Sequence, residues 1–158
     1  MATRFRIDDE LAELLAHGNS MVVATRSAAL EPHATRACGL SVLGPQRIAV
    51  LLPVATSERA VANLRDNGSI AVCISSPRTY RTVQLKGRAR SIGEAADDDL
   101  VASERLLAGF QEAIADQGFS RQQVRNLWQF ESWRVEIEVT SAYAQTPGPG
   151  AGARMEGQ

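Results

Sequence analysis

Apolar and polar residues alternate with a period of two along much of the chain, which is the pattern of half-buried β-strands. In residues 79–92 the odd positions Val83, Leu85 and Ala89 are apolar, and residues 133–143 repeat the alternation. Shorter apolar segments cover residues 21–25, 34–42, 47–54 and 70–75, and turn signals such as Gly44-Pro45 lie between them. We therefore expect six strands, of which the first three are antiparallel because their connections are short.

Apolar residues at helical spacing predict four helices, over residues 7–17, 57–67, 97–118 and 120–127. Asp8 and Asp9 precede the first helix, and Asp97, Asp98 and Asp99 put negative charge at the positive end of the third. The segment from 146 to 152 is rich in proline and glycine, so it can be neither helix nor central strand.

Together these elements predict an α+β fold that is mainly β, an antiparallel barrel with helices inserted between some strands. A Rossmann-type sheet is excluded because no glycine-rich turn joins the first strand to a helix. The 158 residues correspond to one domain in size. We assign residues 1–145 to this domain and residues 146–158 to a Pro/Gly-rich C-terminal tail.

Charge and composition exclude several kinds of partner. Seventeen basic and eighteen acidic residues leave a net charge of -1, so nucleic acid and anionic lipid are not expected partners. The longest apolar stretch, residues 47–55, is too short to span a bilayer, and we expect a cytoplasmic protein. Cys38 and Cys73 form neither a disulfide framework nor a CxxC motif, so both are expected to pack as reduced, small apolar residues.

The segment from Thr56 to Arg59 is the first candidate site, because it joins an apolar strand to the start of a predicted helix. Main-chain N–H groups, the hydroxyl groups of Thr56 and Ser57 and the Arg59 guanidinium would all face one spot there. Such a spot favours an anion, since the helix dipole and charge-assisted hydrogen bonds act together. A serine in this position is also an ordinary helix N-cap, and the segment alone does not separate the two interpretations.

The polar face of the strand over residues 79–92 is the second candidate. Thr82 and Gln84 carry uncharged donors that can bind ring carbonyl and nitrogen atoms, whereas the basic residues further along are interpreted as a solvated face. His17 and His33, the two histidines of the chain, have no ligand spacing around them, so no metal site is predicted. No Ser-His-Asp arrangement is present in the sequence either.

Three segments in this order resemble the pyridoxamine phosphate oxidase-related FMN-binding split β-barrels: Ser57-Glu-Arg-Ala-Val-Ala-Asn-Leu-Arg-Asp-Asn67, Tyr80-Arg-Thr-Val-Gln-Leu-Lys-Gly87 and Gln145-Thr-Pro-Gly-Pro-Gly-Ala-Gly152. The resemblance implies a six-stranded Greek-key split barrel with peripheral helices, which forms a homodimer with an FMN site at each shared interface. It also implies that Ser57 and Arg59 hold the phosphate, that Thr82 and Gln84 contact the flavin from the neighbouring subunit, and that Arg36 lies near the flavin. Arg36 is one position from the usual register, and the tail lacks the histidine of the vitamin-B6 oxidases, so pyridoxamine phosphate is not the expected substrate.

The function that this resemblance implies is an FMN-dependent oxidoreductase that acts on a small molecule. In such a protein the cofactor supplies the hydride chemistry, and no protein acid or base is required. The alternatives are a flavin-binding or flavin-sensing module without turnover, and the same barrel holding a deazaflavin or a haem.

Overall fold

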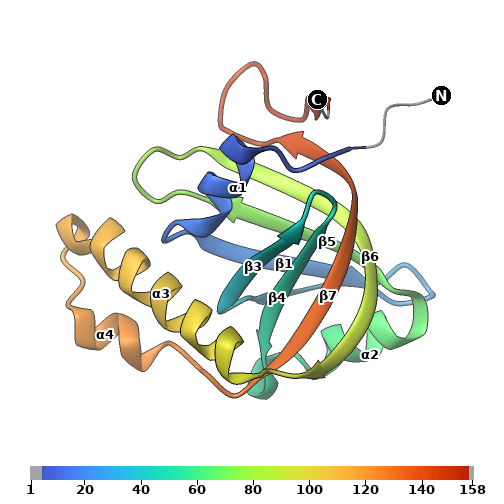
Figure 1. Cartoon of the computed structure of the whole chain (residues 1–158), viewed down its shortest axis with the longest axis horizontal. Coiled ribbons are helices and arrows are strands. Elements are labelled where there is room, and N and C mark those ends of the chain that lie inside the picture. The colour runs from blue at the N-terminus through green and yellow to red at the C-terminus, as the bar shows by residue number, and fades with distance from the viewer. Residues whose placement is uncertain (1–4, 157–158) are drawn as a thin grey trace.

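A computed structural model describes residues 5–156, and it consists of one antiparallel sheet with helices around it (Figure 1). The strands in this part of the chain are β1 (Ser20–Arg26), β2 (Pro32–Arg36), β3 (Gly39–Gly44), β4 (Arg47–Pro53), β5 (Ser69–Ser75), β6 (Thr82–Glu94), β7 (Ser132–Ala144) and β8 (Arg154–Met155). The α-helices are α1 (Asp9–Ala16), α2 (Glu58–Asn67), α3 (Asp97–Ala113) and α4 (Arg121–Asn126), and η1 (Val54–Thr56) and η2 (Ala115–Gln117) are short 3₁₀ turns. No helix within residues 5–156 is long and apolar enough to cross a membrane.

The sheet has the order β2-β1-β5-β6-β7-β4-β3, with β8 added on β7. The long strands β6 and β7 pair along their whole length and join the two halves of the sheet. Irregularities at Lys86/Gly87 and at Ala89/Ser91 interrupt the β6–β7 register, and such bulges bend and twist a strand. The sheet therefore coils into a barrel whose edge strands are β2 and β3, with α1 and α2 on opposite sides of it (Figure 1).

The predicted fold class is confirmed, but the part of the chain that the structure describes holds eight strands where six were expected. The strand predicted over residues 34–42 is divided, because the chain leaves β1 after Ala37 and joins β4 at Cys38. The Ala37 amide donates to the Met21 carbonyl oxygen at 3.2 Å, and the Cys38 amide donates to that of Leu51 at 2.9 Å. The eighth strand lies in the C-terminal segment, which turns back onto β7.

Aliphatic side chains of every long strand fill the barrel. Alternate residues of β1, β5 and β6 are buried, as the period-two pattern predicts, whereas β4 is buried on both faces after Arg47. The largest fully buried side chains are Leu15, Met21, Ile48, Leu52, Ile74, Leu85, Leu107, Ile137, Val23, Val50, Val72 and Val135. A second, smaller cluster of Leu107, Ile114 and Val124 lies between α3 and α4.

Helix α3 is held against the barrel by its N-terminal end. The Asp99 carboxylate accepts a hydrogen bond from the Ala96 amide at 2.9 Å and forms an ion pair with Arg134 on β7 at 3.1 Å. One turn further along, the buried Ser103 hydroxyl donates to the Cys38 carbonyl oxygen at 2.6 Å. These contacts fix the first two turns of α3, and the last residues of the helix predicted over 97–118 form the 3₁₀ turn η2 instead.

Candidate functional site

The start of α2 is built differently from the sequence prediction. Ser57 is fully buried, and its hydroxyl donates to the Pro53 carbonyl oxygen at 2.6 Å, within the turn that links β4 to α2. In this structure the Ser57 hydroxyl therefore faces inward and not toward the spot beside Arg59, and the assignment of Ser57 to a phosphate stays a prediction. The physical reason is that η1 turns the chain tightly enough to bring the Pro53 carbonyl within reach of the hydroxyl.

Because Ser57 bonds inward, no side-chain hydrogen bond caps α2 within residues 5–156. The amide donors of an uncapped first helical turn are available to another acceptor, and the helix dipole favours a negatively charged one. Thr56 and Arg59 are both exposed beside this turn. Thr56 and Arg59 thus lie where the anion site was predicted, and Ser57 contributes the position of the turn but not its hydroxyl.

Strand β2 runs past this helix start and contacts it from one side. The Thr35 hydroxyl donates to the Thr56 carbonyl oxygen at 3.2 Å, and Glu31, just before β2, pairs with Arg59 at 3.2 Å. Alternate residues of an extended segment share a face, so His33 lies on this side between the two contacts. Its Nε2 atom is buried without a hydrogen-bond partner in the described residues.

A buried, unpaired ring nitrogen costs about 1–3 kcal/mol, and it marks a place where a ligand atom would be stabilising. The sequence analysis gave His33 no place in a site, and the structure places it on the edge strand β2. The sequence did not predict that His33 lies close to α2. It did contain one indication, because His33 and Thr35 are two positions apart and therefore share a face of the strand.

The other three candidates, Arg36, Thr82 and Gln84, lie on the outer face of the sheet. The register aligns Arg36 with Val22, Val22 with Cys73, and Cys73 with Gln84, so one row of neighbours leads from Arg36 to Gln84 across four strands. Three strand spacings separate them by about 14 Å. Arg36 donates to the Ser20 hydroxyl at 3.3 Å, and the Thr82 hydroxyl lies 2.6 Å from that of Ser75.

The six candidates therefore form two groups in one chain. Thr56, Ser57 and Arg59 lie at the start of α2, and Arg36, Thr82 and Gln84 lie on the outer face of the sheet. Thr35 aligns with Val23, Val72 and Leu85, all buried, whereas Gln84 belongs to the opposite, outward face. The predicted anion site at the start of α2 is thus joined to β2 through Thr35, whose side chain lies on the inner face, and Thr82 and Gln84 point away from it. No hydrogen bond within residues 5–156 holds the Gln84 side chain, which leaves its amide available to a ligand or a second protein.

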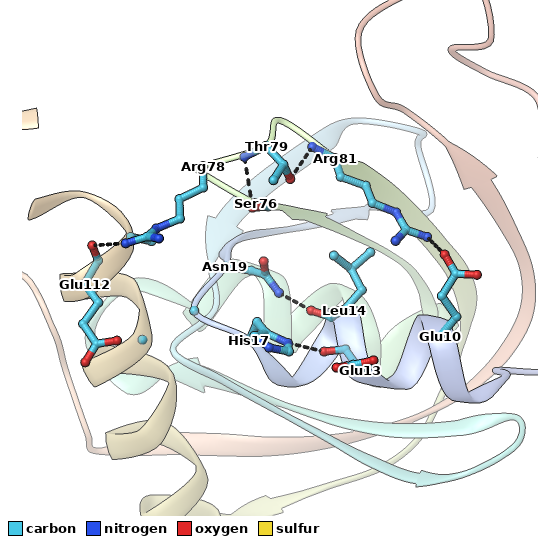
Figure 2. A pocket seen from close by; sticks show the side chains of 13 residues that line it. Glu10, Glu13, Leu14, His17, Asn19, Ser76, Arg78, Thr79, Arg81 and Glu112 are labelled. Atoms are coloured by element: carbon cyan, nitrogen blue, oxygen red, sulfur yellow. Dashed lines mark hydrogen bonds and ion pairs between the residues drawn. The ribbon is translucent and has the colours of Figure 1, made fainter. Parts of the chain in front are cut away.

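A separate polar cavity of about 610 Å³ lies between α1, the β5–β6 turn and α3 (Figure 2). On one side Arg81 pairs with Glu10 at 2.7 Å, and on the other Arg78 donates to the Glu112 carbonyl oxygen at 3.3 Å. The Asn19 amide donates to the Leu14 carbonyl oxygen at 2.6 Å. Arg81 and Glu10 thus pair with each other, whereas Arg78 and Asn19 bond to main-chain oxygens, and none of the six candidates lines this cavity.

The fold defines a split-barrel protein, and the start of α2, which no side chain within residues 5–156 caps, is its candidate anion site. A family model described as pyridoxamine 5'-phosphate oxidase matches residues 7–142, so the chain belongs to the pyridoxamine 5'-phosphate oxidase family. The family predicted from three sequence segments is thereby confirmed. A comparison with curated protein sequences finds no significant match.

Solved structures with the same fold are distant in sequence. HupZ of Group A Streptococcus superposes with a TM-score of 0.58 at 15% identity, covering 92% of this chain and 99% of that one. A putative pyridoxamine 5'-phosphate oxidase of Lactobacillus delbrueckii gives 0.57 at 16%, covering 88% and 94%. A conserved hypothetical protein of Mycobacterium tuberculosis gives 0.54 at 20%, covering 90% and 86%. At these identities the likeness supports the fold alone.

Proposed function

We propose that this protein binds FMN and acts as an FMN-dependent oxidoreductase. The observation that carries the proposal is the uncapped start of α2, with exposed Arg59 and with the unpaired Nε2 atom of His33 on the neighbouring strand β2. Membership of the pyridoxamine 5'-phosphate oxidase family supports a phosphate-bearing flavin as the ligand. When bound, the flavin supplies the hydride chemistry.

In this proposal the phosphate is held by main-chain N–H groups of the first turn of α2, by Arg59 and by His33. Arg59 is paired with Glu31, but both side chains are exposed, and exposed pairs contribute only about 0–1 kcal/mol. A phosphate can therefore replace Glu31 as the partner of Arg59 at little cost, while it gains bidentate, charge-assisted hydrogen bonds. Ser57 acts indirectly, because its bond to Pro53 sets the position of the turn.

The same residues favour a site shared between two copies of the chain. Thr82 and Gln84 point away from α2 of their own chain, so a second copy is needed to bring them to the flavin. The outer face around them carries the small or apolar side chains of Val22, Ala24 and Cys73, with Val22 exposed. An isologous pairing through this face would place Thr82 and Gln84 of one copy opposite the α2 site of the other.

The test of phosphate binding compares two flavins. FMN and riboflavin share a ring system, so their affinities differ by what the phosphate contributes. We expect Arg59→Gln to weaken FMN binding about tenfold or more and to leave riboflavin binding nearly unchanged, by fluorescence titration. Arg65→Gln is the matched control, since it removes the same charge near the other end of α2. A colourless protein that quenches neither flavin would contradict the proposal, as would equal losses for both flavins in Arg59→Gln.

Turnover requires a separate measurement on the FMN-loaded protein. We expect NADH or NADPH to bleach the flavin absorbance and oxygen or an organic acceptor to restore it. A flavin that binds tightly but is reduced by neither nucleotide would favour the flavin-binding module without turnover.

The shared site is tested by complementation. Neither Arg59→Gln nor Gln84→Ala dimers should bind FMN normally, but mixed dimers contain one site without either change. After exchange of subunits in an equal mixture, we expect about a quarter of the sites to recover. If mixing restores no sites, or if the protein sediments as a monomer, the shared site is wrong.

A further inference from the structure

The polar cavity of about 610 Å³ between α1, the β5–β6 turn and α3 has no part in the proposed function (Figure 2). We propose that it binds a small zwitterion with one carboxylate and two cationic groups, which is the charge pattern of a free basic amino acid. This site is independent of the flavin, because none of the six candidate residues lines the cavity.

The two helices that line the cavity leave space between them. Each contributes residues three or four positions apart, which lie on one face of a helix. These residues are Glu10, Glu13 and His17 on α1 and Gly109, Glu112 and Ala113 on α3. Gly109 and Ala113 have little or no side chain, and a backbone contact between Gly18 and Gly109 sets the distance between the two helices. The cavity therefore exists because small residues of α3 face polar residues of α1.

The β5–β6 turn, residues 76–81, forms the third side of the cavity and is held by its own hydrogen bonds. The Ser76 amide donates to the Arg81 carbonyl oxygen at 2.9 Å, and the Tyr80 amide donates to that of Ser76 at 2.9 Å. Tyr80 has a φ of 59°, a left-handed conformation that a bulky residue adopts only where its surroundings enforce it. From this turn Arg78 extends toward α3 and Arg81 toward α1 (Figure 2). Two guanidinium groups thus stand on a backbone of fixed shape.

Arg78 and Glu13 carry charges that no side chain of the cavity balances. The Arg78 guanidinium donates to the main-chain oxygen of Glu112 at 3.3 Å, and no carboxylate between residues 5 and 156 forms an ion pair with it. The Glu13 carboxylate has no hydrogen-bond or ion-pair partner in the same part of the chain. Arg78 therefore favours a carboxylate on the ligand, and Glu13 favours a cationic group.

Glu112, on α3, favours a second cationic group. Its carboxylate lies 3.8 Å from Arg121, and the two side chains are 67% and 68% exposed, so this pair contributes little. The other charged pair of the cavity, Glu10 and Arg81, is closed at 2.7 Å. The groups left to a ligand are thus one guanidinium and two carboxylates, and the complementary molecule carries one carboxylate and two cationic groups, as free arginine does.

A buried amide gives the cavity a fixed polar contact. Asn19 is only 3% exposed, and its Nδ2 atom donates to the Leu14 carbonyl oxygen at 2.6 Å. Its Oδ1 atom points away from Leu14, toward the β5–β6 turn, and accepts no hydrogen bond within residues 5–156 (Figure 2). Because a buried acceptor without a donor costs free energy, an N–H group of the ligand would be stabilising there.

The probes are L-arginine, L-citrulline and agmatine. Citrulline has the shape of arginine without the charge of the guanidinium group, and agmatine is arginine without its carboxylate. We expect calorimetric titration of the full chain with L-arginine to show one site per chain. L-citrulline and agmatine should each bind about tenfold more weakly, because each lacks one charge-assisted hydrogen-bond partner.

Two substitutions test the charges separately. Arg78→Gln should weaken L-arginine about tenfold and leave agmatine unchanged, because agmatine has no carboxylate to lose. Glu13→Gln should weaken L-arginine and agmatine by similar factors, because both probes keep their cationic groups. Arg105→Gln and Glu94→Gln are the matched controls, since both residues are exposed and neither lines the cavity.

A third substitution tests the location without changing any charge. Ala113→Leu fills part of the cavity from α3 and should weaken L-arginine about tenfold or more. Ala108→Leu, at an exposed position of α3 outside the cavity, should leave the affinity for L-arginine unchanged. Equal effects of the two substitutions would overturn the cavity as the binding site. If Ala113→Leu fails to fold by circular dichroism, the two charge substitutions, at exposed positions, decide the question.

Three further results would overturn the proposal. They are the absence of any heat of binding with L-arginine, equal affinities for L-arginine and L-citrulline, and equal losses of L-arginine and agmatine affinity in Arg78→Gln. Each can be measured whether or not the protein binds FMN, so this site and the proposed function fail independently.

Discussion

Gly18, in the turn after α1, and Gly109, on α3, pack backbone against backbone. A Cβ atom added at Gly18 would lie 2.0 Å from the carbonyl carbon of Gly109 and 2.2 Å from the amide nitrogen of Phe110. Backbone atoms cannot move aside as a side-chain tip can, so this contact fixes the distance between α3 and the barrel. Helix α3 lines the polar cavity beside α1 through Gly109 and Glu112, and it lines an apolar cavity next to α4 through Phe110, so the glycine contact helps to position both.

We predict that Gly18→Ala is strongly destabilising, by about 3 kcal/mol or more in the free energy of unfolding, because α3 must move or the chain must strain. Gly93→Ala is the control, since nothing lies within 4 Å of the Cβ position at Gly93. Urea unfolding monitored by circular dichroism measures both. If Gly18→Ala is as stable as Gly93→Ala, the packing of α3 against the turn is wrong.

The inward hydrogen bond of Ser57 leads to a second prediction, which separates stability from binding. Ser57→Ala leaves the Pro53 carbonyl without its partner in a buried turn, and we expect a loss of about 1–3 kcal/mol of stability. Ser91→Ala, on an exposed strand position, should change stability by less than about 0.5 kcal/mol. The FMN affinity of folded Ser57→Ala should fall less than that of Arg59→Gln. An unchanged unfolding curve with a full loss of FMN affinity would instead assign the Ser57 hydroxyl to the phosphate.

A substitution at His33 should have opposite effects on the stability of the ligand-free protein and on its affinity for FMN. Replacing it by leucine removes the buried, unpaired Nε2 atom, so the ligand-free protein should be as stable as the wild type or more stable. The same change removes a proposed phosphate donor, so FMN should bind more weakly, with riboflavin little affected. Thermal unfolding with and without FMN measures both effects, and His17→Gln, at an exposed helix end, serves as the control. Equal stabilisation of the two proteins by FMN would remove His33 from the site.

Glu136 on β7 should make stability depend on pH in the acid range. Hydrogen bonds from Arg134 and then from Arg47 hold the pKa of the Glu136 carboxyl below its ordinary value of about 4.3. A lowered pKa in the folded state means that the carboxylate stabilises the fold above the unfolded pKa and that this contribution is lost as pH falls through the folded value. The difference in unfolding free energy between wild type and Glu136→Gln should therefore be largest at pH 6–7 and shrink below about pH 4. Glu94→Gln is the control. A difference in unfolding free energy between wild type and Glu136→Gln that does not vary with pH, or that is as small as the difference for Glu94→Gln, would contradict a stabilising role of the Glu136 carboxylate.

The two thiols should react at different rates with a thiol reagent such as dithionitrobenzoate. Burial raises the pKa of Cys38, against the opposing hydrogen bonds of Ser132 and Ser103, and burial also raises the pKa of Cys73. Cys38 is buried, whereas Cys73 is partly accessible in a single chain, on the outer face through which the proposed pairing of two copies would cover it. At a concentration low enough to separate the copies, we expect a faster phase that Cys73→Ser abolishes and a slow phase that reaches completion only on unfolding. A single fast phase of two thiols would show that Cys38 is accessible.

Local patterns predicted most of the secondary structure, and tertiary contacts explain the exceptions. The alternation around Val83 and Leu85 predicted β6 because both side chains fill the barrel. The break between Ala37 and Cys38 has no local signal, since it exists only because Met21 and Leu51, on different strands, accept the two amides. The short strand β8 likewise could not be predicted from local pattern, because it forms only by pairing with β7.

By itself, the sequence determined the fold class, the position of each main helix and a family, because these follow from periodicity, capping residues and motifs in order along the chain. It also predicted an anion site at the start of α2, which stays a prediction. Only the tertiary structure decided which atoms face that site: it turned Ser57 inward to Pro53 and brought His33 beside Arg59, and it placed Gln84 on the opposite face of the sheet. The reason is that the sequence gives the type of each side chain but not its contacts. Those contacts are made with strands and helices that are distant in the sequence, and only folding brings them together.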